Sequence, residues 1–487
     1  MTLHASGTPV SESARERPWG ALLPAAELRR RIWQQLGVAI ESYTEEIGRR
    51  RVTPELAVER IRESLARFDF GAPVPPEEAI EFVTRGLSEY QTHTPHPRYF
   101  GLFNPAPGTM GVVADALVAA FNPQLAAWSH SPLAVEIEQT TVRALGAKFG
   151  YDAQSIDGTF CSGGMEANHT AVLTALTKAF PEYGEGGSRA ISGEPLLYVS
   201  TESHHSFLKA ARMCGLGTRS VRHIGVDRGL RMRPDALAEA IERDISAGAL
   251  PFLVVATAGT TNAGAVDPLQ HCGAIAHRYG LWFHVDAAWG GAAAFVPELR
   301  EVLAGAGQSD SITFDAHKWL SVPMGAGMYL TRHADILDRT FRIQTSYMPR
   351  EAAGLDVVDP HQHTMQWSRR FIGLKVFLSM AVAGEQGYAR ALRHQTAMGD
   401  LLRMRLAQAG WKIENETPLP VVCFTDPDGA DPHGIAMRVV QSGEAWISTT
   451  VLAGSKTVLR ACITNYRTAP EDIDALVEIL GRARESC

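Results

Sequence analysis

The chain has 487 residues, of which 45% are hydrophobic and 20% are charged, and its formal net charge is −7. This length exceeds what a single hydrophobic core supports, and the composition is that of a globular enzyme. The negative charge argues against a nucleic-acid or anionic-membrane partner, because both favour a basic surface. No apolar run approaches the roughly 18 residues of a membrane-spanning helix. The first 20 residues lack a basic patch followed by an apolar core, so we expect no secretory signal.

Six cysteines are scattered along the chain and never form a C-x-x-C pair. We therefore expect reduced thiols in a cytoplasmic protein and no metal site. The cysteines are Cys161, Cys214, Cys272, Cys423, Cys462 and Cys487.

The N-terminal part divides into two predicted segments. Residues 1–20 are polar and contain Pro, Gly and Ser, so we expect them to be disordered. Residues 21–95 are predicted to form a helical segment, because apolar residues recur there at four-residue spacing. These residues are Leu28, Ile32, Leu36 and Ile40. Such an amphipathic segment needs a large surface to cover its apolar stripe, which favours contact with a second subunit.

The rest of the chain alternates short apolar strands with helical stretches, which predicts an α/β fold with a mostly parallel sheet. Residues 96–375 are predicted to form a large domain, and residues 376–487 a small C-terminal α/β domain. Strands are predicted at 196–200, 252–257, 282–285, 311–314 and 328–330 in the first part, and at 420–424 and 458–463 in the second. Parallel sheets bind ligands beyond the carboxyl ends of their strands, so the loops that follow these strands are the candidate sites.

Two of these loops carry chemistry suited to a carbonyl cofactor such as pyridoxal 5′-phosphate (PLP). Lys318 lies in D-A-H-K-W, directly after a predicted strand, and His317 and Trp319 can partly desolvate its amine, as a Schiff-base lysine needs. Asp286 lies in F-H-V-D-A-A at the end of another strand. A carboxylate there can keep a pyridine nitrogen protonated, and Ala288 leaves room for a flat ring.

Three further loops add weaker signals. The sequence C-S-G-G-M-E-A-N at 161–168 runs into a helix, whose N-terminus favours an anion such as phosphate. His204, after the strand at 196–200, can stack on an aromatic ring, and Thr261 can bond to a cofactor or substrate oxygen. Each motif alone also fits a structural role: a surface lysine, a capping aspartate, a plain glycine loop, a polar histidine pair or an ordinary turn.

The five motifs occur in one chain order, and in this order the chain resembles the PLP-dependent group II amino-acid decarboxylases. That family includes aromatic-L-amino-acid, glutamate and tyrosine decarboxylases. The resemblance runs from about Trp19 to the C-terminus, and H-K-W preceded by H-V-D-A-A is its most specific part. It also includes H-P-R-Y-F at 96–100, W-S-H-S-P at 128–132 with Glu136 and Glu138, R-R-F at 369–371, Leu459-Arg460 and Arg467-Thr468.

The resemblance implies a role for each motif. Lys318 would form an aldimine with PLP, Asp286 would pair with the pyridine nitrogen, and His204 and Ala288 would pack on the two ring faces. The phosphate would be held by Gly164, Met165 and His317, with Thr261 near the ring oxygen. The implied architecture is fold type I: a central seven-stranded sheet, a small C-terminal domain, and an N-terminal helical segment that wraps the other subunit of a homodimer with shared active sites.

The chain departs from the family pattern at three places. Met165 stands where many relatives have serine, and Asp315 stands where several have Asn or Pro near the phosphate. An anion at 315 must therefore be compensated by backbone groups or a cation, or point away. The segment V-D-P-H-Q-H-T-M-Q-W-S at 358–368 lacks the tyrosine with which typical members protonate the quinonoid. Pro360 or His361 falls nearest that position, and we take His361 as the candidate proton donor.

The function expected from the resemblance is decarboxylation of an L-amino acid to its amine and CO2 through a quinonoid. An alternative is decarboxylation-dependent oxidative deamination to an aldehyde, because relatives without the loop tyrosine can let O2 consume that intermediate. An aminotransferase or other fold-type I lyase, and a non-catalytic PLP-fold protein, are the remaining alternatives.

The substrate is less clearly encoded. Leu102, Phe103 and Trp128, together with the loop residue Trp367, suggest an apolar pocket for an aromatic or bulky neutral side chain. Arg98 or His130 could instead serve an acidic one.

Overall fold

The computed structural model describes residues 20–485 apart from residues 56, 350 and 353. The predicted disordered segment 1–20 thus lies outside the described residues, except for Gly20. The chain divides into two compact units, of which the first ends at His93 and the second begins at Thr94. No helix among the described residues is both long and apolar enough to cross a membrane.

The first unit is helical. Its α-helices are α1 (Ala26–Glu46), α2 (Val58–Leu65) and α3 (Pro76–Glu89). Pro76 occupies the first turn of α3, where a missing N–H has no consequence. On α1, Trp33 and Val38 remain 59% and 61% exposed. This region is therefore helical, and two apolar side chains of α1 are exposed; its role in contacting a second subunit stays a prediction.

The second unit holds two sheets and their covering helices. Its strands are β1 (Asp157–Cys161), β2 (Pro195–Ser200), β3 (Val221–Ile224), β4 (Leu250–Thr257), β5 (Trp282–Asp286), β6 (Ser311–Asp315), β7 (Gly327–Thr331), β8 (Lys412–Ile413), β9 (Val421–Thr425), β10 (Ser448–Leu452) and β11 (Lys456–Cys462). Its α-helices are α4 (Thr109–Phe121), α5 (Pro132–Lys148), α6 (Gly164–Ala179), α7 (Tyr183–Gly186), α8 (Ser206–Met213), α9 (Pro234–Ser246), α10 (Leu269–Arg278), α11 (Ile336–Phe341), α12 (Gly373–Gln408), α13 (Pro432–Ser442) and α14 (Pro470–Glu485).

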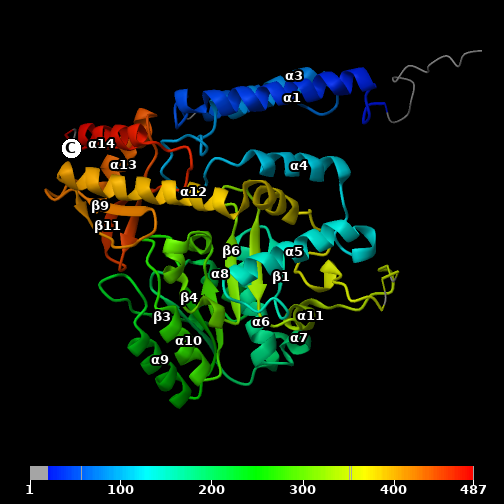
Figure 1. The fold of residues 1–487 in the computed structure, drawn as a ribbon, viewed down its shortest axis with the longest axis vertical. Helices are drawn as coiled ribbons and strands as arrows, with labels where there is room; N and C mark the ends of the chain where they lie inside the picture. The colour runs from blue at the N-terminus through cyan, green and yellow to red at the C-terminus, as the bar shows by residue number, and fades with distance from the viewer. Residues whose placement is uncertain (1–19, 56, 350, 353, 486–487) are drawn as a thin grey trace, which may run out of the picture. The chain divides into compact units, whose positions relative to one another are not determined.

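The larger sheet has seven strands in the order β1-β7-β6-β5-β4-β2-β3. Figure 1 labels β1, β3, β4 and β6 of this sheet. The strands from β6 to β3 run parallel, whereas β7 is antiparallel to both of its neighbours. Every residue of β5 and β6 is buried, as expected for parallel strands covered on both faces. The predicted mostly parallel seven-stranded sheet is therefore confirmed.

The predicted strands of this sheet match β2, β4, β5, β6 and β7 to within two residues. β1 and β3 are not among the predicted strands. β1 opens with Asp157 and Gly158, and β3, at the sheet edge, has the polar Arg222 and His223 between buried Val221 and Ile224. Neither strand forms the continuous apolar run by which the buried strands were found.

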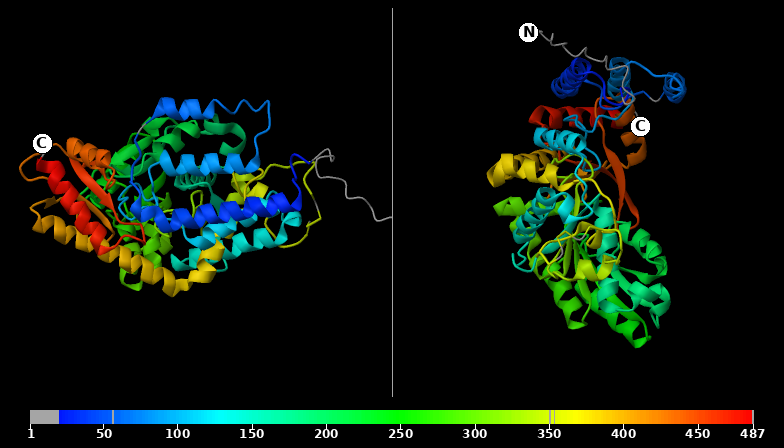
Figure 2. Two further views of the ribbon diagram at one scale, coloured as in Figure 1. Left: turned by 90° about the horizontal axis from the view of Figure 1, so that it is seen from above. Right: turned by 90° about the vertical axis from the view of Figure 1, so that its right-hand side faces the viewer.

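The smaller sheet has the order β10-β11-β9-β8 and is antiparallel throughout. Its core includes Trp411, Phe424 and Leu459, packed with residues of α12, α13 and α14. Helix α12 extends from α4 and α5 to α14, and it is interrupted at Gly384, whose φ of 64° lies in the left-handed region. Figure 2 shows the C-terminal helices and strands, in orange and red, gathered at one side of this unit.

Candidate active site

The motif residues converge because neighbouring parallel strands deliver them to one edge of the sheet. Asp286, the last residue of β5, is level with Thr257 of β4 and with Thr313 of β6. β6 continues to Asp315 and then turns into the segment that holds Lys318. Helix α6 begins at Gly164 and packs against β5, β6 and β7. The glycine loop, the aspartate and the lysine thus meet at the carboxyl ends of the central strands, as the motif order predicts.

Lys318 is held in a tight turn immediately after β6. Its backbone N–H donates to the carbonyl of Asp315 at 3.1 Å. Its Nζ lies 2.9 Å from Asp315 Oδ2, and its side chain is 25% exposed. The amine is therefore mostly enclosed, paired with a buried carboxylate, and still open on one side to an incoming carbonyl compound.

The glycine loop leaves space for an anion at the start of α6. The first N–H groups of a helix have no intrahelical acceptor, so those of Gly164 and Met165 are available to a ligand. Glu166 binds the N–H and hydroxyl of Ser162, each at 2.7 Å, and so fixes the loop. A Cβ on Gly164 would lie 2.7 Å from Asp315 Oδ2, so only glycine fits here.

His317 lies beside this cradle and is buried. Its Nδ1 accepts the N–H of Ala326 at 3.1 Å, so the neutral ring carries its proton on Nε2. Burial lowers the pKa of His317 below its usual range, which favours this neutral form. His317 therefore offers one N–H donor, and its Cε1 is 3.5 Å from where a Cβ of Gly163 would be.

Asp286 is buried and bound by two donors. Its Oδ2 accepts from Asn168 Nδ2 at 2.9 Å, and its Oδ1 accepts the N–H of Ala288 at 3.1 Å. Both contacts hold the carboxylate in place, and Ala288 beside it is only partly buried. The carboxylate is thus presented in a fixed orientation to the space above Ala288.

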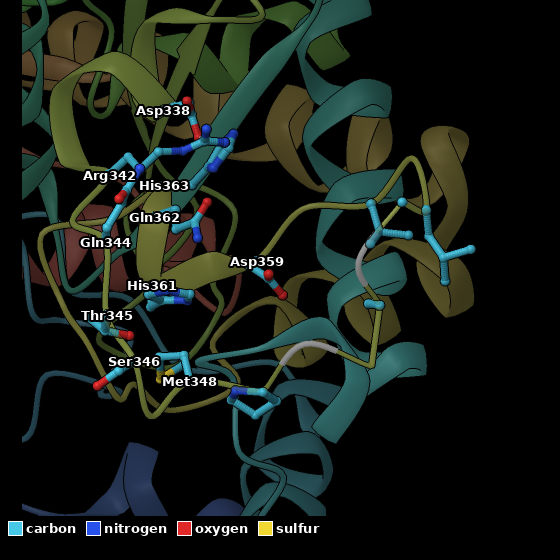
Figure 3. A pocket seen from close by; sticks show the side chains of 15 residues that line it. Asp338, Arg342, Gln344, Thr345, Ser346, Met348, Asp359, His361, Gln362 and His363 are labelled. Carbon is cyan, nitrogen blue, oxygen red and sulfur yellow. The ribbon is translucent and has the colours of Figure 1, made fainter.

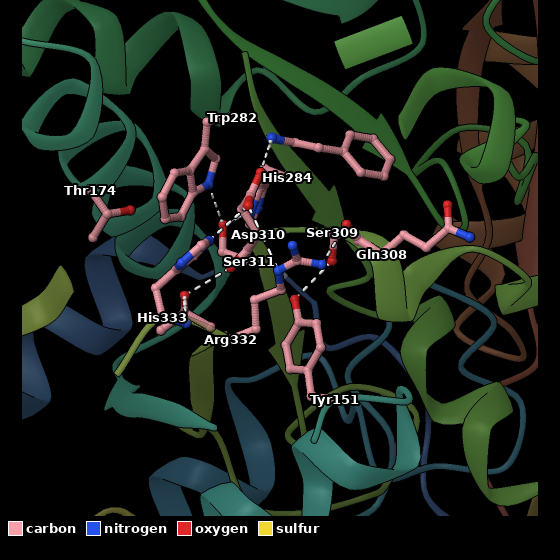
Figure 4. Close-up of polar contacts among 12 residues, drawn as sticks. Tyr151, Thr174, Trp282, His284, Gln308, Ser309, Asp310, Ser311, Arg332 and His333 are labelled. Atoms are coloured by element: carbon pink, nitrogen blue, oxygen red, sulfur yellow. Dashed lines mark hydrogen bonds and ion pairs between the residues drawn. The ribbon is translucent and has the colours of Figure 1, made fainter. Parts of the chain in front are cut away.

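Asn168 belongs to a buried hydrogen-bond network. Its Oδ1 accepts from Thr313 at 2.7 Å and contacts His284 Nε2 at 3.2 Å. His284 Nδ1 in turn contacts the hydroxyl of Ser311 at 2.8 Å, and Trp282 Nε1 donates to the same hydroxyl at 2.9 Å (Figure 4). Because Asn168 Oδ1 can only accept, His284 must donate from Nε2 and accept at Nδ1. Burial lowers the pKa of His284 to about 4, which agrees with a neutral ring.

His204 and Thr261 occupy the loops after β2 and β4. His204 Nδ1 accepts the N–H of Ser206 at 3.2 Å, and Ser206 also accepts from Asn168, which ties the His204 loop to the Asp286 network. The imidazole is exposed and can pack on a ring. Thr261 is partly buried and precedes Asn262, whose amide bonds to Glu202 at 3.2 Å. His204 is close enough to interact electrostatically with Asp286 and Lys318, whereas the place of Thr261 beside the cofactor stays a prediction.

The predicted substrate residues Leu102 and Phe103 have positive φ values of 29° and 58°. Leu102 is 53% exposed, whereas Phe103 is buried. Phe103 stacks on Trp289 with ring centroids 4.5 Å apart, and the guanidinium of Arg460 lies 4.9 Å from its ring. Phe103 thus forms part of a buried aromatic wall, and Leu102 is the open member of the pair.

Arg460 on β11 is a candidate that we did not assign from the sequence. It is 3% exposed, and its Nε and Nη2 have no hydrogen-bond partner among the described residues. A buried guanidinium with two free donors fits a carboxylate. The sequence could have indicated Arg460 as a site residue, because it is a charged residue within the apolar run V-L-R-A-C-I.

The third predicted substrate residue, Trp128, belongs to a second cluster with His361. Its backbone N–H donates to Asp359 at 2.8 Å, and its indole donates to Glu136 at 2.9 Å. His361 is buried, and its backbone N–H and Nδ1 both contact the carbonyl of Ala126 at 3.0 Å.

A cavity of about 640 Å³ is lined by described residues between Asp338 and His363, among them Thr345, His361 and His363 (Figure 3). None of the proposed cofactor residues lies among its lining residues. In this arrangement His361 is thus not brought to Lys318.

The cluster around Lys318 has the features that PLP requires. It combines the amine of Lys318, the buried carboxylate of Asp286 in a fixed orientation, and free N–H groups at the N-terminus of α6. Ala288, which is partly buried, leaves room for a flat ring. The two carboxylate oxygens of Asp315, beside the glycine loop, have no hydrogen-bond partner among the described residues. The carboxylate is paired with the amine of Lys318. No group of three or more metal-ligating side chains occurs in the described part of the chain.

Comparison with known proteins agrees with this geometry. Residues 68–426 match the family model described as the pyridoxal-dependent decarboxylase conserved domain. The chain is 31% identical over 423 residues to an aromatic-L-amino-acid decarboxylase of Bacillus atrophaeus, covering 84% of this chain and 86% of that protein. It is also 31% identical over 421 residues to a cysteine sulfinic acid decarboxylase of Mus musculus, covering 82% of this chain and 85% of that protein.

Among solved structures, mouse CSAD in its apo form aligns with a TM-score of 0.86 at 27% identity, over 94% of this chain and 99% of that one. The fold is accordingly fold type I, and the cofactor of the enzyme is PLP. With the family model matched across most of its length, the chain belongs to the pyridoxal-dependent decarboxylases and is a PLP-dependent carboxy-lyase of amino acids.

Proposed function

We propose that this enzyme decarboxylates an L-amino acid with an aromatic or bulky neutral side chain, releases the amine, and uses Lys318 to hold the cofactor. The observation that carries the proposal is the convergence of Lys318, Asp286 and the glycine loop at one sheet edge.

Different residues around Lys318 would bind different parts of PLP. Gly164, Met165 and His317 would bind its phosphate, Asp286 its pyridine nitrogen, and Lys318 its aldehyde carbon. When bound, PLP supplies an electron sink for the pair of electrons released from the broken Cα–carboxylate bond. Asp286 would keep the ring nitrogen protonated, and the hydrogen bond from Asn168 holds the Asp286 carboxylate in place. His204 and Ala288 would pack on the two faces of the ring, and Thr261 would bond to the ring oxygen.

Arg460 supplies the opposite charge for a substrate carboxylate. Its two unpaired nitrogens are buried and its guanidinium lies against the ring of Phe103, so water does not compete strongly for them. An anion held there orients the substrate relative to the cofactor ring, and orientation selects which bond at Cα breaks.

Apolar side chains near the site support the proposed substrate class, whereas the names of the relatives do not distinguish between substrate classes. Leu102, which is exposed, and the buried Phe103 behind it favour an aromatic or bulky neutral side chain, whereas Trp128 lies in the cluster of His361 and gives no support within this copy of the chain. The relatives include enzymes named for aromatic amino acids and for cysteine sulfinic acid, so their names alone do not choose. A CO2-release screen over the L-amino acids tests this: we expect aromatic substrates to give the highest kcat/KM, and a preference for acidic substrates would contradict it.

Oxidative deamination to an aldehyde is the second candidate, supported by the lack of tyrosine in the segment 358–368. Product analysis separates the two reactions. The amine with stoichiometric CO2 supports simple decarboxylation, whereas aldehyde, ammonia and peroxide with consumption of O2 support the alternative.

We also propose a cytoplasmic homodimer with shared active sites. The exposed apolar residues of α1 and α4 support a partner surface. The five described cysteines, all buried and unpaired, support a reducing environment.

The role of Lys318 is tested by Lys318→Ala. After borohydride treatment with PLP, the wild-type enzyme should carry a pyridoxyl group on the peptide that contains residue 318, and the variant should carry none and be inactive. A pyridoxyl group on another lysine of the wild type would overturn the assignment. Lys209→Ala, which changes a lysine of α8 that we assign no role, is the matched control.

A further inference from the structure

The hairpin formed by β10 and β11 carries Arg460 and contacts loops of the large sheet. Ser448 of β10 is the cross-strand partner of Arg460, and its hydroxyl accepts from Arg460 Nη1 at 3.4 Å. β10 is the edge strand of the small sheet, so no described strand lies along its outer side. On that side, the position of the hairpin therefore depends on contacts outside the small sheet.

Glu202 contacts the tip of this hairpin. It lies two residues before His204, in the loop after β2, and is 3% exposed. Its Oε1 accepts the backbone N–H of Ala453 at 2.8 Å, and its Oε2 accepts from Asn262 Nδ2 at 3.2 Å. Ala453 has a φ of 48°, a conformation that non-glycine residues adopt where their surroundings hold it. The buried carboxylate thus binds the turn of the hairpin with one oxygen and the loop after β4 with the other.

Asn262 contacts the same hairpin from the loop after β4. It follows Thr261, and its Oδ1 accepts the hydroxyl of Thr450 at 2.8 Å. Its Nδ2 also donates to the carbonyl of Val451 at 3.4 Å, and its own carbonyl accepts from the thiol of Cys423 on β9 at 3.2 Å. Asn262 is thereby bound to two strands of the small sheet as well as to the loop after β2.

The loop that carries Thr261 has further anchors beside the small sheet. Asn415 Nδ2 donates to the carbonyl of Ala263 at 2.8 Å, and the hydroxyl of Thr417 donates to the carbonyl of Gly264 at 2.6 Å. Both donors lie between β8 and β9. The loop is thus bound to this part of the chain at several points, so a displacement of the hairpin must also displace the loop or break these hydrogen bonds.

We propose that Glu202 and Asn262 are positioning residues that couple the substrate-carboxylate site to the cofactor site. They hold the hairpin of Arg460 at a fixed place relative to the loops of His204 and Thr261. A carboxylate bound at the hairpin and a ring bound at the loops then favour the same arrangement of all three segments. This inference rests on the proposed function, which gives those segments their roles in binding.

The chemistry of the two side chains suits this role. Both oxygens of Glu202 face N–H donors, so the position needs two acceptors, which a carboxylate has and an amide lacks. The substrate carboxylate must be held in a fixed orientation relative to the cofactor ring, and a misplacement of about 1 Å lowers the rate steeply. Coupling between two binding sites is also reciprocal, so each ligand strengthens binding of the other by the same factor.

Hydrogen exchange measures this coupling without turnover. Peptides that cover residues 448–456, 201–206 and 259–264 are followed by mass spectrometry in the cofactor-free and the PLP-loaded protein. In the wild type, we expect PLP to slow exchange in both loops and also, by about fivefold, in the hairpin peptide, which contains no residue proposed to touch the cofactor. In Glu202→Gln the loops should still be protected by PLP, whereas the protection of the hairpin should be lost.

Thr450 supplies a matched pair of variants. Thr450→Ser keeps the hydroxyl that donates to Asn262 and should behave as the wild type, whereas Thr450→Val has no hydroxyl and should lose the hairpin protection. This pair decides the question if Glu202→Gln does not fold. Hairpin protection that is equal in the wild type and Thr450→Val overturns the proposal. A wild type in which PLP protects neither loop contradicts the proposed function, and this inference falls with it.

A second experiment tests whether Glu202 acts through Arg460. The affinity of the PLP-loaded enzyme for 3-phenylpropanoate, an aromatic carboxylate without an amine, is measured by calorimetry for the wild type, Glu202→Gln, Arg460→Met and the double variant. We expect Glu202→Gln to weaken binding by about tenfold in the wild type and to have no further effect in Arg460→Met, because both changes remove one interaction. Fully additive effects overturn the proposal. If Arg460→Met alone has no effect, the carboxylate role of Arg460 in the proposed function is wrong, and the hydrogen-exchange result still decides whether Glu202 couples the hairpin to the two loops.

Discussion

Asn168 is the residue on which the geometry of the site depends most. Its amide donates to Asp286 and Ser206 and accepts from Thr313 and His284, so all of its main hydrogen-bonding capacity is used. An amide bound on both sides cannot rotate without breaking several bonds at once. The orientation of Asp286 is thereby fixed from a buried network and does not depend on the ligand.

Asp286→Asn should leave PLP bound but lower the rate of decarboxylation by several orders of magnitude. The phosphate contacts survive the change, whereas a neutral amide no longer holds the ring nitrogen protonated. Cofactor affinity from fluorescence titration and turnover from CO2 release measure the two effects separately. A near-normal rate in this variant would count against the pairing.

The lowered pKa of buried His284 leads us to expect that the stability of the folded protein depends on pH. Burial lowers its pKa to about 4 in the folded protein, whereas an unfolded histidine titrates near 6.5. Between these values the unfolded chain binds a proton that the folded chain does not. The stability from the neutral ring is therefore complete above about pH 6.5 and is lost as the pH falls toward 4, by on the order of 3 kcal/mol.

The measurement is the denaturation midpoint of wild type and His284→Gln from pH 7.5 to 4.5. Glutamine can still donate to Asn168 and accept from Ser311, but it does not titrate. The variant should lose less stability than the wild type across this range. Parallel curves for the two proteins would show that His284 is not responsible.

At the scale of elements, the sequence predicts those strands that are buried and consist of a continuous run of apolar residues. The central strands are apolar runs bounded by small residues, so β2, β4, β5, β6 and β7 were found, together with the residues at their carboxyl ends. The network behind Asp286 was not predictable, because it joins α6, β5 and β6 through side chains up to 145 positions apart in sequence. The role of Arg460 was missed for the same reason: its surroundings are made by Phe103, from another part of the chain.

Polar contacts join the segment between α11 and α12 to Ala126, to α6 and to β1. His361 contacts the carbonyl of Ala126, Gln366 donates to Glu166 at 2.7 Å, and His363 lies 3.5 Å from Asp157. Glu166 also binds the glycine loop, so this segment and the phosphate cradle share a carboxylate. We infer that release of these contacts is needed before His361 can act at any reacting centre.

We predict that His361→Phe lowers the yield of amine and raises the yields of aldehyde and peroxide. Without a proton donor, O2 has more time to react before Cα is protonated, and histidine is the segment's side chain best suited to give a proton near neutral pH. Amine, aldehyde and peroxide are quantified from one reaction. His363→Phe is the matched control and should retain the wild-type ratio; an effect of His363→Phe alone would move the assignment to that residue.

At the scale of the whole molecule, apolar surface remains to be covered. On α4, Val113, Leu117 and Phe121 are 41%, 39% and 80% exposed and recur every four residues, so they form one stripe on the helix. Scattered exposed apolar residues are ordinary, but a contiguous stripe indicates an interface. Within the second unit, the described residues do not cover this stripe.

We therefore expect the enzyme to be a dimer and Leu117→Asp to weaken it. A charge in the middle of an apolar interface must be desolvated without a partner, which shifts the equilibrium toward monomers. Light scattering coupled to size-exclusion chromatography should give twice the chain mass for the wild type and a concentration-dependent mixture for the variant, with activity falling as the enzyme is diluted. Met404→Glu is the control, because Met404 is 48% exposed on α12 and should tolerate a charge. A wild-type enzyme that is monomeric and equally active at all concentrations would contradict the shared active site, because then one chain must supply every group that the reaction uses.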